Sequence, residues 1–70
     1  MAIYKVKFDE DSAAMRTSIL SMIDGVDIFA VTEDEYFCLF VDESATEAVE
    51  YELRKAERRD GYCDWKKIKA

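Results

Sequence analysis

The chain has 70 residues with a net charge of −6, and half of its residues are apolar. This length leaves room for one hydrophobic core, so we expect a single domain over residues 1–70, and the apolar content argues against disorder. No apolar run approaches the roughly 18 residues that cross a bilayer, and the first residues lack the layout of a signal peptide. We therefore expect a cytoplasmic protein with no membrane partner.

The first predicted elements are a strand and a helix. Apolar residues and lysines alternate over residues 3–8, which is typical of a half-buried strand. A helix over residues 12–23 follows, because acidic residues before it offer N-capping side chains and Gly25 stops it. The side chains that recur at helical spacing in this segment, and that we expect to be buried, are Met15, Ile19, Met22 and Ile23.

A hairpin and a second helix are predicted next. Residues 26–31 are rich in β-branched and aromatic side chains, and residues 36–41 are continuously apolar, with a polar segment between them. The second helix begins at Ser44, where Ser44 and Glu47 match a capping box. Residues 62–68 form a short final strand. The expected buried stripe of the second helix is Ala45, Ala48, Val49, Leu53 and Ala56.

The resulting element order, βαββαβ, most simply forms a ferredoxin-like sandwich, because right-handed crossovers place both helices on one face of the sheet. We therefore predict an α+β fold with a four-stranded antiparallel sheet in the strand order 4-1-3-2. The first strand then separates the third from the fourth, so the backbones at Cys38 and Cys63 lie about 10 Å apart. Because a disulfide needs Cα atoms closer than about 7 Å, both thiols should be free.

In this topology the end of the first strand shares one edge of the sandwich with the turn of the hairpin. Six carboxylates should crowd this acidic rim: Asp9, Glu10, Asp11, Glu33, Asp34 and Glu35. One interpretation is that they are solvated caps and turns, which favour such residues for local hydrogen bonds. The other is a negative patch that docks onto basic side chains of a partner protein. A calcium or magnesium site is a remote alternative, and we predict neither a metal nor another cofactor.

The sheet face opposite the helices is the second candidate surface, which we call the open face. If Leu39 faces the helices, alternation along the strand turns Tyr36 and Phe40 the other way. Phe29 joins them if Ile28 faces inward. Because a strand that is apolar on both faces generally needs cover on both, this face predicts a partner, and a homodimer through the open face is one candidate.

The charges are distributed unevenly along the chain. Residues 1–53 carry 13 acidic and 3 basic side chains, whereas residues 54–70 carry 3 acidic and 7 basic ones. An acidic body is repelled by a phosphate backbone, so the charge disfavours direct nucleic-acid binding, and we expect a protein partner with a basic surface.

The residue types present disfavour catalysis. The chain has no histidine, asparagine, glutamine or proline, and its two glycines are too few for phosphate-cradling loops. Enzymes of the acylphosphatase type, which share this topology, need an arginine in the first loop and a catalytic asparagine. Because the chain has no asparagine, we exclude this activity. Nothing suggests an apolar pocket that would raise a carboxyl pKa for acid–base work. We predict that the protein is not an enzyme.

Three acidic clusters, Asp9-Glu10-Asp11, Glu33-Asp34-Glu35 and Asp42-Glu43, occur in a small stand-alone chain of this topology. In size, charge and topology the whole chain resembles the small phage-encoded inhibitors of bacterial defence, including anti-CRISPR proteins. The resemblance implies a stoichiometric inhibitor in the host cytoplasm, whose carboxylates imitate nucleic-acid phosphates on a basic groove of its target.

The function that we predict is therefore a non-catalytic protein-binding module, with inhibition of a nucleic-acid-binding complex as its sharpest form. One alternative is a dimeric regulatory domain similar to ACT domains, which holds a small ligand between its subunits. A third is an RNA binder that uses aromatic side chains of the open face together with the basic segment at residues 66–69.

Overall fold

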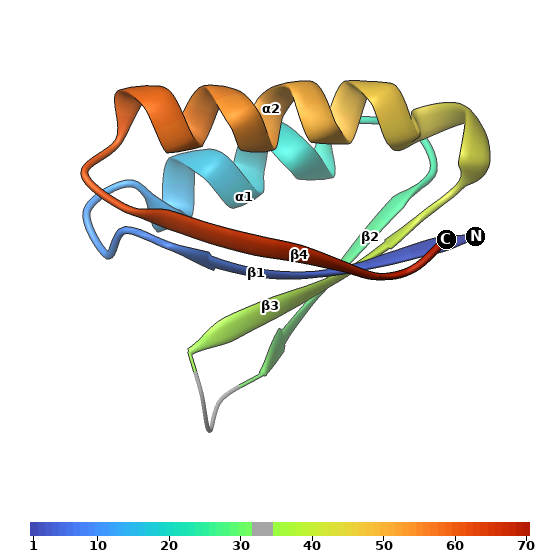
Figure 1. The fold of residues 1–70 in the computed structure, drawn as a ribbon, viewed down its shortest axis with the longest axis horizontal. Helices are drawn as coiled ribbons and strands as arrows, with labels where there is room; N and C mark the ends of the chain where they lie inside the picture. The colour runs from blue at the N-terminus through green and yellow to red at the C-terminus, as the bar shows by residue number, and fades with distance from the viewer. Residues whose placement is uncertain (32–34) are drawn as a thin grey trace.

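The computed structural model describes residues 1–31 and 35–70. Four strands form one antiparallel sheet in the order β2-β3-β1-β4, and both helices cover one of its faces (Figure 1). This arrangement confirms the predicted ferredoxin-like βαββαβ fold. The elements are β1 (Ala2–Phe8), α1 (Ala13–Ser21), β2 (Val26–Val31), β3 (Tyr36–Val41), a 3-10 helix (Glu43–Ala45), α2 (Thr46–Arg59) and β4 (Cys63–Lys69).

The hydrophobic core lies between the helices and the inner face of the sheet. Alternate residues of β1 are buried along its whole length, and β3 contributes Leu39 and Val41. Val49 and Leu53 of α2 and Leu20 of α1 close the core from the other side. Each such side chain contributes about 1.5–3 kcal/mol by leaving water, so the pleat of β1 and the stripe of α2 together fix which face of the sheet is covered. Among the described residues, no helix is long and apolar enough to span a membrane.

The predicted buried stripe of the first helix is wrong at Met15 and Met22, whereas Ile19 is half-buried and Ile23, just after the helix, packs against the core. Met15 and Met22 are 51% and 81% exposed, and the helix instead buries Arg16 and Leu20. The helix is also shorter than expected, at Ala13–Ser21. The buried side of the helix contains an arginine, Arg16. Because the charge of Arg16 is compensated by a residue distant in the sequence, the spacing of apolar residues alone does not predict that this side is buried.

The predicted capping box of the second helix is also wrong. Asp42, two residues earlier, accepts hydrogen bonds from the backbone nitrogen of Ser44 at 3.4 Å and from its hydroxyl at 2.6 Å. This carboxylate begins a 3-10 turn, and α2 starts after it at Thr46 without a side-chain cap. The charged acceptor outcompetes the Ser44 hydroxyl as a cap, since hydrogen bonds to ionised groups are the stronger ones. Of the expected α2 stripe, Ala48 is exposed.

Candidate functional site

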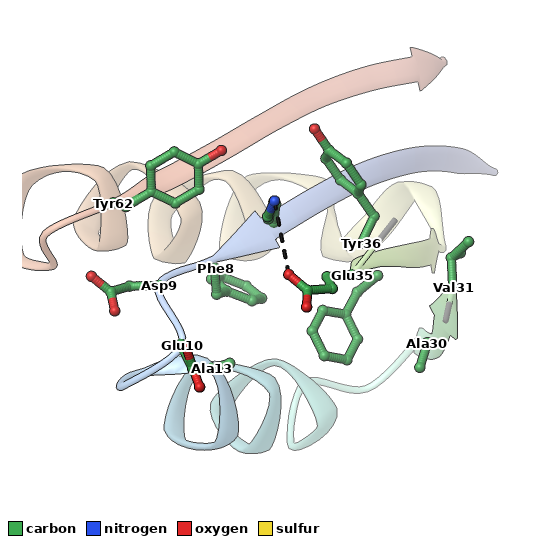
Figure 2. Close-up of a pocket in the computed structure, with 11 residues that line it drawn as sticks. Phe8, Asp9, Glu10, Ala13, Ala30, Val31, Glu35, Tyr36 and Tyr62 are labelled. Atoms are coloured by element: carbon green, nitrogen blue, oxygen red, sulfur yellow. Dashed lines mark ion pairs between the residues drawn. The ribbon is translucent and has the colours of Figure 1, made fainter. Parts of the chain in front are cut away.

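A cleft of about 770 Å³ opens at the end of the sandwich between the start of α1 and the β2–β3 hairpin. We call it the rim cleft, and Figure 2 shows the residues that line it. Phe8 and Phe37 form an apolar floor, with ring centroids 6.0 Å apart. Asp9, Glu10 and Glu35 supply three carboxylates around it, and Lys7 supplies one ammonium group, so the charged side chains of the lining sum to −2. The cleft therefore combines an apolar base with a negatively charged edge.

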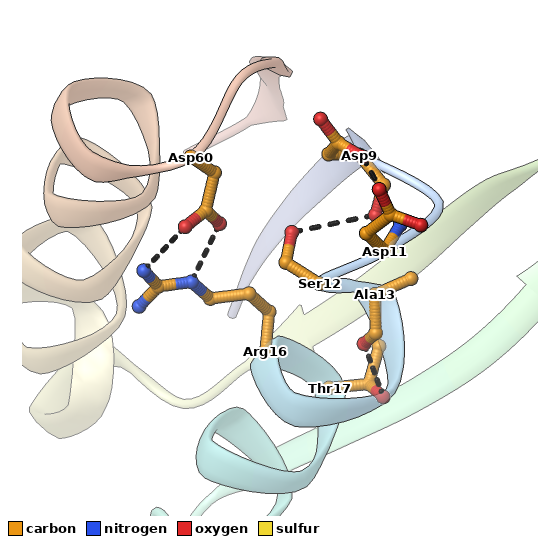
Figure 3. Close-up of polar contacts among 7 residues, drawn as sticks. All are labelled: Asp9, Asp11, Ser12, Ala13, Arg16, Thr17 and Asp60. Carbon is orange, nitrogen blue, oxygen red and sulfur yellow. Dashed lines mark hydrogen bonds and ion pairs between the residues drawn. The ribbon is translucent and has the colours of Figure 1, made fainter.

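Asp9 orders the turn that leads into α1. Its carboxylate accepts a hydrogen bond from the backbone amide of Asp11 at 3.0 Å (Figure 3). Its own amide donates to the carbonyl of Tyr62 at 3.1 Å. The carbonyl of Asp9 accepts the amide of Ser12 at 3.0 Å. Asp9 thus has the role of a local cap, as the interpretation of the rim as caps and turns requires.

Glu10 and Asp11 differ from Asp9. Both are exposed, and within residues 1–31 and 35–70 neither carboxylate takes part in a hydrogen bond or ion pair. Glu10 lines the rim cleft, whereas Asp11 does not. Their charges are consequently available to a partner that approaches this end of the molecule.

Glu35 reaches the cleft from the hairpin. Its Oε2 lies 4.0 Å from Nζ of Lys7, and its side chain is 83% exposed, so this ion pair is worth little. The backbone of Glu35 is left-handed, with φ of 60°. A side chain other than glycine is disfavoured there by roughly 1–2 kcal/mol, so glycine at this position would relieve strain. The remaining predicted rim residues, Glu33 and Asp34, lie outside the described residues.

The rim cleft is suited to a lysine or arginine side chain. An aliphatic stem can lie on Phe8 and Phe37 while its cationic head reaches the carboxylates of Glu10 and Glu35. The part of the chain that the structure describes contains no group of three or more histidine, cysteine or carboxylate side chains placed to hold a metal ion. The chemistry that this geometry offers is binding of organic cations.

A buried ion pair that the sequence did not predict lies behind the rim. The guanidinium of Arg16 donates from Nε and Nη2 to the two carboxylate oxygens of Asp60, both at 2.8 Å (Figure 3). The side chains are only 6% and 9% exposed. The hydrogen bonds from Arg16 hold the pKa of Asp60 below its usual range, and they raise the pKa of Arg16. The pair joins α1 to the end of α2 and so positions the turn that forms one wall of the cleft.

A second polar network joins α2 to β1 and β4. The hydroxyl of Tyr4, a fully buried residue, donates to Glu50, which also lies 3.1 Å from Arg54 and 3.6 Å from Lys67. Burial, and then the bond to Glu50, raise the pKa of Tyr4. The same bond lowers the pKa of Glu50. Among the described residues no buried side-chain polar atom lacks a partner, so the network is a satisfied structural connection.

The open face carries the aromatic side chains that alternation predicted. Phe29 is 56% exposed and packs edge-on against Phe40, with centroids 5.4 Å apart. Tyr36 lies on the same face, and its ring is covered by Nζ of Lys5 at 4.4 Å and Nζ of Lys7 at 5.7 Å. These cation–π contacts leave the aromatic half of the face only partly free.

The sequence reasoning missed the concentration of lysines on the other half of the open face. Strand pairing places Lys66 beside Lys5 and Lys69 beside Ile3, so β1 and β4 present four lysines to the side away from the helices. These are Lys5, Lys7, Lys66 and Lys69. Each lysine is visible in the sequence, but the face that it occupies depends on the register of β4, which shifts between Ile3 and Tyr4.

Comparison with known proteins found no matching family model, no matching curated protein and no matching solved structure.

Proposed function

We propose that the chain is a non-catalytic protein-binding module that receives basic side chains of a partner protein in the rim cleft. The observation that carries this proposal is a cleft with an apolar floor and carboxylates of Asp9, Glu10 and Glu35 at its edge. The net charge of −6 supports it, because a negative molecule attracts basic surfaces over a distance of about one Debye length, roughly 8 Å in physiological salt.

The sharpest form of this function is stoichiometric inhibition of a nucleic-acid-binding protein. A groove that binds a phosphate backbone presents lysine and arginine side chains. Glu10 and Asp11, which are exposed, would take the places of phosphates on such a groove, and the cleft would hold one cationic side chain between Glu10 and Glu35. Complementary charges of this kind raise the association rate and set specificity more than they raise affinity.

The test compares two triple variants that have the same net charge. The cleft variant is Glu10→Lys, Asp11→Lys and Glu35→Lys, and the control variant is Asp24→Lys, Glu43→Lys and Glu47→Lys near the opposite end of the sandwich. Each reversal adds two charges, so both variants go from −6 to 0. All six carboxylates are exposed, so both variants should fold. Asp9 is left intact because its carboxylate caps the turn before α1.

The probe is a fluorescein-labelled oligoarginine peptide, whose binding is followed by fluorescence anisotropy at several salt concentrations. The expected result is that the cleft variant loses at least about tenfold in affinity beyond the loss of the control variant. Equal losses in the two variants would show that only net charge matters and would contradict the proposal. A partner captured from lysate by the wild type and by the control variant, but not by the cleft variant, should then lose its nucleic acid on addition of one equivalent of the chain.

A further inference from the structure

Strand register arranges the open face in three rows that run across the sheet. The row at one end of the sheet consists of Asp27 on β2, Phe40 on β3, Ile3 on β1 and Lys69 on β4. It therefore begins with an acid and ends with a lysine. The middle row is Phe29, Cys38, Lys5 and Lys66. The row nearest the rim is Val31, Tyr36, Lys7 and Asp64. Apart from Asp27, the β2–β3 half thus carries aromatic and apolar side chains, and the β1–β4 half carries four lysines together with Ile3 and Asp64.

The β2 edge of this face has a shallow hollow of about 510 Å³. Phe29 and Phe40 line it, and the carboxylate of Asp27 stands beside them. Asp27 is exposed and, within the described residues, makes no ion pair. The hollow therefore offers an apolar wall and one negative charge, which suits the stem and ammonium group of a lysine.

We propose that the open face binds the open face of a second copy of this chain, about a two-fold axis parallel to the strands. Rotation about that axis lays β4 over β2 of the second copy and β1 over β3, while each row stays above its own equivalent. Lys69 then meets Asp27 of the second copy at the hollow. In the middle row Lys66 meets Phe29, which gives a cation–π contact in place of an exposed aromatic ring.

A two-fold axis perpendicular to the strands is disfavoured by charge. An axis perpendicular to the strands would lay Lys5 over Lys5 and Lys66 over Lys66, because each strand would cross its own copy. Like charges in direct opposition are unfavourable across an interface. The axis parallel to the strands avoids this. Because every two-fold interface is isologous, each unlike pair then occurs twice.

The charges and aromatic rings of the open face favour a second copy over single-stranded RNA. Base stacking needs a free aromatic face, whereas the ring of Tyr36 is already covered by Lys5 and Lys7. Asp27 and Asp64 would also stand beside a phosphate backbone. The face measures roughly 400 Å² in projection, from four strands about 4.8 Å apart and six residues about 3.3 Å apart. Since a stable interface buries about 800 Å² per partner, the dimer should be weak, in the micromolar range.

This inference goes beyond the proposed function. Lys7, Val31 and Tyr36 both line the rim cleft and belong to the open-face row nearest to it, whereas the row that contains Asp27 lies at the opposite end of the sheet. The two proposals are tested by different variants and readouts. Reversal of the rim carboxylates should leave self-association intact, and loss of self-association should leave oligoarginine binding intact.

The experiment uses the complementary single variants Asp27→Lys and Lys69→Glu in sedimentation equilibrium, from about 10 μM to about 1 mM chain. Each variant alone places like charges together at both ends of the row, so each should weaken dimerisation at least about tenfold. In an equimolar mixture, a heterodimer contains one chain of each variant. Position 27 of the Asp27→Lys chain then meets position 69 of the Lys69→Glu chain, which is a pair of opposite charges. The second pair of the heterodimer, Lys69 with Asp27, is native. The mixture should therefore form heterodimers about as well as the wild type dimerises.

Three results would overturn the inference. The first is a wild type that stays monomeric to 1 mM. The second is a wild type that dimerises while the mixture of variants does not, which would exclude the axis parallel to the strands. The third is single-stranded oligouridine that binds more tightly than the second copy and is lost on Lys66→Glu, which would assign the face to nucleic acid. Both substituted positions are exposed, and circular dichroism of each variant checks that the fold is retained.

Discussion

Replacing Arg16 by methionine tests the buried ion pair that joins the two helices. The substitution keeps most of the apolar stem but removes the guanidinium, and it leaves the carboxylate of Asp60 nine-tenths buried with no cation at 2.8 Å. Loss of one partner of a buried pair costs about 3–5 kcal/mol. A chain of this length has a total stability of roughly 4–10 kcal/mol, so Arg16→Met should remove a third or more of it.

The assay is urea unfolding followed by the fluorescence of Trp65, the single tryptophan. With a slope of about 1 kcal/mol per molar urea, Arg16→Met should lower the midpoint by about 3 M. The double variant Arg16→Met, Asp60→Leu should recover most of the loss, because an apolar pair no longer leaves a buried charge. A single variant that loses less than about 1 kcal/mol, or a double variant that is no better than the single one, would refute the role of this pair.

The pH dependence gives an independent check on the same pair. Arg16 lowers the pKa of Asp60, so the stabilisation is present above the unfolded pKa, about 4, and is lost as the pH falls through the folded value. Below about pH 4 the wild type should lose stability faster than Arg16→Met, and the two unfolding free energies should converge. Parallel pH profiles would contradict the assignment.

Three further outcomes follow from single contacts. Tyr4→Phe removes the hydroxyl that donates to Glu50 and should cost about 1.5 kcal/mol in urea unfolding; no change would mean that water replaces the bond. Burial raises the pKa of Cys63 to about 11. In a Cys38→Ser background this thiol should therefore react at pH 8 about 100-fold more slowly in the folded chain than in the unfolded chain. The unfolded thiol ionises first as the pH rises, so the free energy of unfolding should fall above about pH 9. Gly25→Ala introduces a side chain at φ of 88° and should destabilise by about 1–3 kcal/mol, whereas an unchanged midpoint would exclude strain there.

Most of the fold could be predicted because local patterns and topology agree. The alternation in β1 and the apolar run of β3 fixed the strands to within a residue, and the order of elements left one simple topology. The facing of Phe29, Tyr36 and Phe40 followed from the two-residue period of a strand, once Leu39 was assigned to the core.

The parts that could not be predicted depend on distant partners. Arg16 is buried because Asp60, 44 residues away, neutralises it, and nothing near Arg16 in the sequence signals that contact. The start of α2 was misplaced because two candidate caps lie two residues apart and the carboxylate of Asp42 forms the bonds. The lysine half of the open face depends on how β4 pairs with β1, and an irregularity near Ile3 sets that register.

The measurement that tests the central claim most directly is oligoarginine binding by the two triple variants of equal net charge. The cleft variant with Glu10, Asp11 and Glu35 reversed should lose binding, and the variant reversed at the opposite end of the sandwich should keep most of it. Equal binding by the two variants would show that the rim cleft does not recognise basic side chains, and the proposed function would be wrong.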